Sequence, residues 1–226
     1  VMAGDAQMDP ADLPTLLDAA IDNNIDYVKG NRLLTGEAWK NMPRRRYIGN
    51  AGASFLTKIA SGYWHVADSQ TGYTVISLRA LRLIDIDAIY ARYGMPNQLL
   101  VMLNIYNCTV RDVPIRPVYG IGEKSGFEPL LMIPKLSWLL MKWFLWRLKE
   151  KYVIRDFHPL VFFYFFGFLT GIVSAVLAVR MLILWATLGH APPMTALAFG
   201  FFAVISLQFT MFAMWFDMEA NKDLKG

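Results

Sequence analysis

Two long apolar runs near the C-terminus constrain the fold of this 226-residue chain more than any other feature. Residues 159–179 and 195–216 contain no charged side chain. Each run reaches the roughly 20 residues that a helix needs to cross the core of a bilayer. A turn with Pro192 and Pro193 joins them. The sequence therefore predicts a transmembrane helical hairpin. Two core helices of a soluble protein are the alternative, although buried helices this long usually carry a polar face.

Basic residues lie before the first apolar run and after the second, which are the two ends that a hairpin brings to the same side of a membrane. The connecting turn, residues 189–193, contains no Lys or Arg. By the positive-inside rule, the N-terminal part and the C-terminus are predicted to be cytoplasmic. Arg180, near the end of the first run, either extends to the lipid headgroups or is a functional charge in the membrane. The flanking basic residues are Lys142, Arg147, Lys149, Lys151, Arg155, Lys222 and Lys225.

Composition agrees with a membrane protein. Hydrophobic residues make up 55% of the chain, against about 45–50% apolar residues in soluble domains. The formal net charge is +4, and the basic residues lie beside the apolar runs, which favours an anionic lipid or substrate over nucleic acid. The single cysteine, Cys108, excludes an internal disulfide. A nucleophilic role for Cys108 has no supporting His or Asn context.

Residues 1–128 alternate between strand-like and helix-like segments, which indicates an α/β domain. Asp12 is the expected N-cap of the first helix. The first residues have the pattern of the second half of a β-strand. We therefore expect the sequence to be the C-terminal part of a longer protein; a complete small domain that begins with a strand is the alternative. The expected strands are 25–29 and 74–78, with an extended stretch over 108–119, and the expected helices lie within 12–21, 44–60, 78–83 and 97–107.

Short polar side chains follow the opening segment at a spacing of two. Asp5 and Gln7 therefore point the same way at the end of a strand. Carboxylate and amide oxygens suit a hard divalent ion, Mg²⁺ or Mn²⁺. Three arginines, Arg44 to Arg46, begin a helix, where a positive charge opposes the macrodipole. They suggest a bound anion, with a solvated basic face as the alternative. His65 has no second His at ligand spacing and is interpreted as structural.

Residues 134–157 are apolar but contain regularly spaced charges. Lys135, Lys142 and Lys149 recur every seven residues and fall on one side of a helix, with tryptophans between them. This pattern is typical of a helix that lies in the membrane interface. A helix packed on the α/β domain is the alternative. The predicted divisions are an α/β domain over 1–128, interfacial helices over 129–157, and the hairpin with a short tail over 158–226.

Four stretches together resemble one family. VMAGDAQMDP, YVKGNR, ADSQTGY and VPIRPVYGIGEKSG occur in the order and spacing of the family 2 glycosyltransferases that act on polyprenyl phosphates, the group of dolichyl-phosphate mannose synthase and its two-helix-anchored relatives. The resemblance implies a GT-A (Rossmann-like) glycosyltransferase domain that lacks its N-terminal part here. It also implies a nucleotide-sugar donor, a polyprenyl-phosphate acceptor, a cytoplasmic active site, and inversion at the anomeric carbon.

The resemblance also assigns roles to single residues. Ala3 replaces the first acid of the family's acidic motif, so the nucleotide contact of that acid is not expected here. The remaining assignments are Asp5 and Gln7 as ligands of Mg²⁺ or Mn²⁺, Arg32, Arg46 and Asn50 on the acceptor phosphate, Asp68 as the catalytic residue, an acidic side chain that faces the donor sugar, and Lys124, in a Gly-rich loop, on the donor diphosphate.

Two other functions are compatible with parts of this sequence. A processive polysaccharide synthase has the same fold and also lies in the membrane. The Arg-Trp pair of its signature motif is absent from this sequence, and two membrane-spanning helices are too few to form a channel for a polymer. A non-catalytic, membrane-anchored scaffold subunit is the second alternative. Gly167 and Gly171 form a Gly-x-x-x-Gly pattern, which predicts a homo-oligomer through the hairpin.

Overall fold

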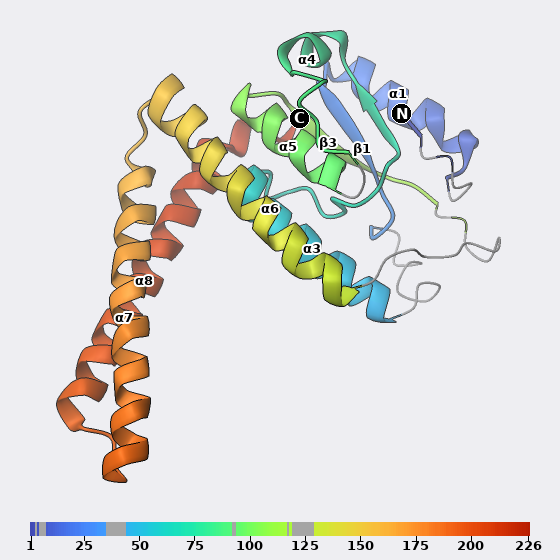
Figure 1. The fold of residues 1–226 in the computed structure, drawn as a ribbon. Coiled ribbons are helices and arrows are strands. Elements are labelled where there is room, and N and C mark those ends of the chain that lie inside the picture. The colour runs from blue at the N-terminus through green and yellow to red at the C-terminus, as the bar shows by residue number, and fades with distance from the viewer. Residues whose placement is uncertain (3, 5–7, 35–43, 92–93, 117, 119–128) are drawn as a thin grey trace. The chain divides into compact units, whose positions relative to one another are not determined.

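A computed structural model describes the chain except for residues 3, 5–7, 35–43, 92–93, 117 and 119–128, and except for the side chains of residues 44–48 and 129–132 (Figure 1). The chain forms two compact units. The first comprises residues 1–151 together with 221–226, and the second comprises residues 152–220. The candidate site residues Asp5, Gln7 and Lys124 lie outside the described residues.

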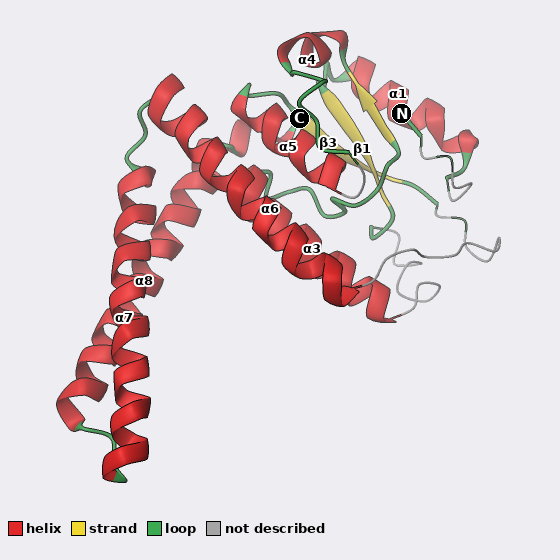
Figure 2. Cartoon of the chain, in the orientation of Figure 1, coloured by secondary structure: helices red, strands yellow, loops and turns green. Residues whose placement is uncertain are grey.

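A three-stranded sheet lies at the centre of the described part of the first unit (Figure 2). Its central strand, β1 (Tyr27–Asn31), pairs antiparallel with β2 (Thr74–Ile76) and parallel with β3 (Val110–Pro114). Every residue of β1 is buried. The predicted mixed α/β class is confirmed for this unit, although most of the chain is helical.

Helices cover both faces of the sheet. Side chains alternate along β1, so Tyr27 joins the core beneath α5 (Met95–Ile105), whereas Val28 joins the core beneath α1 (Leu13–Asp22). Two further helices are α3 (Arg44–Ser61) and α4 (Leu78–Leu83), and both match the predicted ranges closely.

Asp12 is the N-cap residue of α1, as the sequence predicts, and Pro14 lies in the first turn. A 3₁₀ turn, Pro10–Asp12, precedes α1, and the carboxylate of Asp9 caps this turn by accepting the Ala11 N–H at 2.9 Å. Asp12 makes no capping hydrogen bond and instead accepts the Arg116 N–H at 3.0 Å.

The long helix α6 (Pro129–Lys149) packs on the α/β domain with one face and exposes apolar side chains on the other. Leu140 and Trp143 are buried in a core that α3 and α5 share. On the other face Trp138 is 67% exposed and Leu145 is 57% exposed. The alternative of a packed helix therefore holds for one face. The lysines that recur every seven residues are exposed, as their spacing predicts, and a π-helical segment, Glu150–Arg155, continues the helix.

The last residues of the chain belong to the first unit instead of forming a separate tail. The Asn221 Oδ1 accepts hydrogen bonds from the Asn104 Nδ2 at 2.8 Å and from the Lys151 Nζ at 2.7 Å. Leu224 packs against the core beneath α5. These contacts place residues 221–226 in the same compact unit as the α/β domain. The predicted division into 1–128, 129–157 and 158–226 stays a prediction.

The second unit is a helical hairpin of α7 (Leu160–Leu188) and α8 (Pro193–Ala220). Gly189 ends α7 in the left-handed conformation, with φ of 75°, which glycine adopts without steric cost. Both helices are long and apolar enough to cross a membrane. Within their most apolar stretches only 17% and 6% of the residues are buried. Such exposure fits a lipid-facing hairpin better than the core of a soluble protein.

Gly167 and Gly171 face the other helix of the same hairpin. A Cβ at Gly167 would lie 2.8 Å from the Thr210 Oγ1, and one at Gly171 would lie 2.9 Å from the Ser206 Oγ. The Ser206 hydroxyl donates to the Gly167 carbonyl at 2.8 Å. The Gly-x-x-x-Gly pattern thus allows close approach of α7 and α8 within one chain. Oligomerisation through the hairpin stays a prediction without support from this pattern.

We expect Gly167→Leu to destabilise the hairpin by about 1–3 kcal/mol, because the added side chain meets α8 in a tightly packed contact. Gly200→Leu is the matched control, since a Cβ at Gly200 on α8 would meet nothing within 4 Å. Denaturation of the detergent-solubilised protein, followed by circular dichroism, measures both variants. Equal stability of the two variants would contradict the packing described.

Candidate functional site

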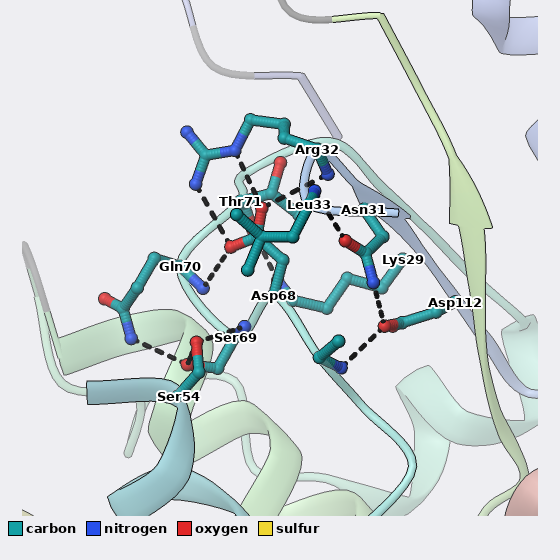
Figure 3. A network of polar contacts seen from close by, with 11 residues as sticks. Lys29, Asn31, Arg32, Leu33, Ser54, Asp68, Ser69, Gln70, Thr71 and Asp112 are labelled. Carbon is teal, nitrogen blue, oxygen red and sulfur yellow. Dashed lines mark hydrogen bonds and ion pairs between the residues drawn. The ribbon is translucent and has the colours of Figure 1, made fainter. Parts of the chain in front are cut away.

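A group of polar side chains lies where β1 and β3 end. Because the two strands run parallel, their carboxyl ends meet at the same edge of the sheet. Asn31 ends β1 and Arg32 follows it, Asp112 lies on β3, and Asp68 lies in the loop between α3 and β2. Figure 3 shows these side chains converging. We call this group, with Lys29, the strand-end cluster.

Arg32 and Asp68 form a buried ion pair at the centre of the cluster. The guanidinium donates from Nε to the Asp68 Oδ2 at 2.8 Å and from Nη2 to the Asp68 Oδ1 at 3.1 Å. Arg32 is 6% exposed and Asp68 is 0% exposed. This two-point contact fixes the plane of the guanidinium. Removing one partner of such a pair leaves an uncompensated buried charge, which costs about 3–5 kcal/mol.

Backbone groups also hold the Asp68 carboxylate. Its Oδ2 accepts the Arg32 N–H at 3.3 Å, and its Oδ1 accepts the Gln70 N–H at 3.2 Å. Burial raises the pKa of Asp68, but the hydrogen bonds and charge of Arg32 and the charge of Lys29 outweigh it, so the pKa lies below the ordinary value. Asp68 is therefore ionised at neutral pH and is a poor proton acceptor.

Asp112 connects the segments on which Arg32 and Asp68 lie. Its Oδ2 accepts hydrogen bonds from the Asn31 Nδ2 at 2.6 Å and from the Ala67 N–H at 2.7 Å. The Asp112 Oδ1 is buried and has no hydrogen-bond partner among the described residues. Burial raises the pKa of Asp112 above the ordinary value, and these two hydrogen bonds offset the rise only in part.

Lys29 lies beside Asp112 on the paired strand and is fully buried. Its ammonium donates to the Thr71 carbonyl at 2.5 Å. Burial lowers the pKa of Lys29 to about 8, and the charges of Asp68 and Asp112 oppose this shift. The cluster therefore contains two cations and two carboxylates within one buried network.

A second set of hydrogen bonds holds the Asp68 loop on α3. The Ser54 Oγ accepts the Ser69 N–H at 3.1 Å. The Gln70 side chain and the Thr57 hydroxyl both donate to the Asn97 Oδ1, at 2.9 Å and 3.1 Å. This support ties α3, the loop and α5 together, so the backbone around Asp68 is anchored on two helices.

The structure brings together some of the predicted site residues. Arg32 and Asp68 come from different motifs and are in direct contact. Asn50 lies on α3 one turn before Ser54, and Arg46 lies in the first turn of the same helix. The predicted metal ligands and Lys124 are not among the described residues, and in the described part of the chain no group of three or more His, Cys, Asp or Glu could hold a metal ion.

Sequence reasoning missed Lys29, Asn31 and Asp112 as members of the cluster. Lys29 and Asn31 stand inside the YVKGNR stretch, but only Arg32 was given a role. Asp112 is the single acid of its strand and follows Arg111, with Val110 and Val113 on either side of the two charges. A carboxylate on a strand that is partly buried needs a hydrogen-bond partner, and that requirement was the available signal.

Two other predictions on single residues agree with the structure. Cys108 is fully buried, and burial raises the pKa of its thiol to about 11, so it is not an activated nucleophile. One ring nitrogen of His65, Nε2, lies 2.9 Å from the Val110 carbonyl oxygen. This contact agrees with a structural role for His65.

Comparison with known proteins supports the family resemblance. Over 131 residues the chain is 31% identical to the UDP-N-acetylglucosamine–dolichyl-phosphate N-acetylglucosaminyltransferase of Methanococcus voltae, and the alignment covers 55% of this chain and 52% of that enzyme. Over 136 residues it is 30% identical to an uncharacterized protein of Methanocaldococcus jannaschii. This alignment covers 57% of this chain and 56% of that protein. A dolichyl-phosphate glycosyltransferase is thus a distant relative of this protein.

The chain spans about half the length of the curated relatives it matches. No protein-family model matches it. No solved structure matches it either.

The buried lysine gives the strand-end cluster a measurable pH dependence. The pKa of Lys29 is lowered in the folded protein from its ordinary value of 10.5 to about 8. Between these values the unfolded chain binds more protons than the folded one, so the contribution of Lys29 to stability rises with pH. We expect the free energy of unfolding of the wild type, minus that of Lys29→Met, to increase from about pH 8 to about pH 10.

Urea denaturation across this pH range measures the difference. Lys135→Met is the matched control, because Lys135 is exposed on α6. A difference for Lys29→Met that stays flat with pH, like that of the control, would contradict a lowered pKa.

Proposed function

We propose that this chain is part of a membrane-anchored glycosyltransferase that moves a sugar from a nucleotide-sugar donor to a polyprenyl phosphate. The observation that carries the proposal is the contact between Arg32 and Asp68. They belong to two motifs, YVKGNR and ADSQTGY, which the family resemblance assigns to one active site. The similarity to the enzyme of M. voltae supports the same class of acceptor.

Arg32, Arg46 and Asn50 are proposed to bind the acceptor phosphate. Arginine suits this role because its planar fork matches two phosphate oxygens. Asp68 already fixes the guanidinium of Arg32 in one plane. A phosphate that approaches this guanidinium therefore meets an oriented group, which reduces the entropy lost on binding.

Asp68 is proposed to face the donor sugar as an ionised carboxylate. Its lowered pKa makes it a weak base. A polyprenyl phosphate carries a negative charge at neutral pH, so it attacks without losing a proton to the enzyme. The reaction needs alignment and charge stabilisation more than acid–base chemistry, and a paired, immobile carboxylate is suited to alignment.

The donor side of the site rests on the family resemblance. Asp5 and Gln7 offer oxygen ligands of the kind that Mg²⁺ or Mn²⁺ prefers, and Lys124 is proposed to contact the donor diphosphate. A bound metal ion would offset the negative charge on the departing nucleoside diphosphate.

The hairpin is proposed to anchor the enzyme, with the α/β unit on the cytoplasmic side. Both α7 and α8 are long and apolar enough to cross a bilayer. A polyprenyl chain stays in the bilayer because burying its apolar surface is favourable. Its phosphate is therefore met near the headgroups, and a membrane anchor keeps the active site at that depth.

Metal dependence tests the donor half of the proposal. We expect the full-length protein to transfer labelled sugar from a nucleotide sugar to polyprenyl phosphate in detergent. A chelator should abolish transfer, and Mg²⁺ or Mn²⁺ should restore it. Asp5→Ala should lower kcat/KM at least about 100-fold, because the metal contributes several kcal/mol. Asp18→Ala, an exposed acid on α1, is the control. Full activity in the presence of chelator would refute the metal assignment.

Substitution of Arg46 tests the acceptor half. Arg46→Ala should raise the KM for polyprenyl phosphate or lower kcat, while the affinity for the nucleotide sugar stays nearly unchanged. Arg46→Lys should restore activity only in part, because an ammonium lacks the planar fork. Arg82→Ala, an exposed arginine on α4, is the matched control. Weakened donor binding with unchanged lipid kinetics would show instead that Arg46 serves the donor diphosphate.

A further inference from the structure

Asp112 contacts both loops that carry the Arg32–Asp68 pair. Asn31, which donates to its Oδ2, immediately precedes Arg32, and Ala67, which donates to the same oxygen, immediately precedes Asp68. The Asn31 Oδ1 also accepts the Leu33 N–H at 2.8 Å. The Asn31 side chain is therefore bonded to Asp112 and to the residue that follows Arg32. Figure 3 shows Asp112 beside these groups.

Asp112 lies in a regular strand, whereas the two residues of the ion pair do not; the Asp68 loop is held from α3 and α5 at Ser69 and Gln70, and Asp112 holds it at Ala67. Asp112 lies inside β3, and its Cα is paired with that of Lys29 in the parallel ladder. Arg32 follows the end of β1, and Asp68 lies in a loop without regular structure. A strand residue fixed by ladder hydrogen bonds is a rigid reference point for loop residues.

We propose that Asp112 is a positioning residue that sets the geometry of the Arg32–Asp68 pair by holding both adjacent loops with one carboxylate oxygen. This inference rests on the proposed function for its kinetic test. Both donors are uncharged N–H groups, so the role requires an acceptor oxygen at the Oδ2 position and no negative charge. Asparagine can supply that oxygen, and alanine cannot.

Asp26 provides a matched control at the opposite end of the same strands. It is 4% exposed, and its carboxylate accepts the Thr109 N–H at 2.9 Å and pairs with Arg79. It therefore joins the residues just before β1 and β3, whereas Asp112, within β3, accepts a hydrogen bond from Asn31 at the end of β1. Asp26→Ala removes another carboxylate that links these two strands, without touching the loops at the candidate site.

The first readout does not depend on enzymatic activity. The Arg32 Nε–H, which donates to Asp68, should give a ¹⁵N–¹H signal that exchanges slowly with water in the full-length protein. We expect this signal to be lost or shifted in Asp112→Ala and kept in Asp112→Asn and Asp26→Ala. If Asp112→Ala does not fold, Asn31→Ala, which removes one of the two hydrogen bonds, should shift the signal in the same direction.

The second readout is the kinetics of transfer. A displacement of about 1 Å in a site can cost about 100-fold in rate, so we expect Asp112→Ala to lower kcat by about 10- to 100-fold. Asp112→Asn should stay within about threefold of the wild type because it keeps the acceptor. In an Asp68→Ala background, Asp112→Ala should cause no further loss, because residues that act through one group are non-additive.

Three results would overturn the inference. One is an Arg32 signal and a kcat in Asp112→Ala that match those of Asp26→Ala. Another is Asp112→Asn behaving like Asp112→Ala, since charge would then be required. The third is full additivity with Asp68→Ala. A wild type without transferase activity would refute the proposed function alone, because the Arg32 signal still decides the role of Asp112.

Discussion

The candidate site depends on the parallel pairing of β1 with β3. This pairing brings residues that are 81 positions apart, Asn31 and Asp112, within hydrogen-bond distance. A carboxylate links the two strands at each of two places, Asp26 just before β1 and Asp112 within β3. Buried carboxylates are costly unless they are hydrogen-bonded. Each of them therefore favours one register of the pair, since a slip by one residue would leave it without its donors.

A second buried network ties the C-terminal residues to the α/β unit. Arg147 on α6 is fully buried and donates to the Ile59 carbonyl at 3.2 Å, and Lys151 donates to the Asn104 carbonyl at 3.0 Å. Gly62 has a φ of +77°, and a Cβ there would collide with the Arg147 guanidinium, so a larger residue would strain the backbone and displace this side chain. Lys151 and Asn221, on the two sides of the hairpin in the sequence, are joined directly by a hydrogen bond.

Sequence patterns predicted the local structure well and the long-range contacts poorly. The ranges of α3 and α4 and the two hairpin helices follow from periodicity, apolar length and turn residues, which are local signals. Which face of α6 packs on the domain depends on α3 and α5, which are distant in sequence. The cluster partner Asp112 was missed for the same reason, because strand pairing is not encoded in local periodicity. Gly167 marked a close helix contact, but the pattern could not identify its partner as α8.

Under the proposed function, the low pKa of Asp68 means that the site catalyses the reaction by positioning the reacting groups and not by transferring a proton. An acid held ionised by Arg32 cannot serve as an effective base at neutral pH. A phosphate acceptor needs no base, so the site loses nothing by this pairing. What it must provide is a fixed distance between the groups that hold the acceptor and the donor. Asp112 lies in the sheet and holds the residues that precede Arg32 and Asp68. Under the proposed role, these two uncharged hydrogen bonds set the geometry of the ion pair, although they add no charge to the site.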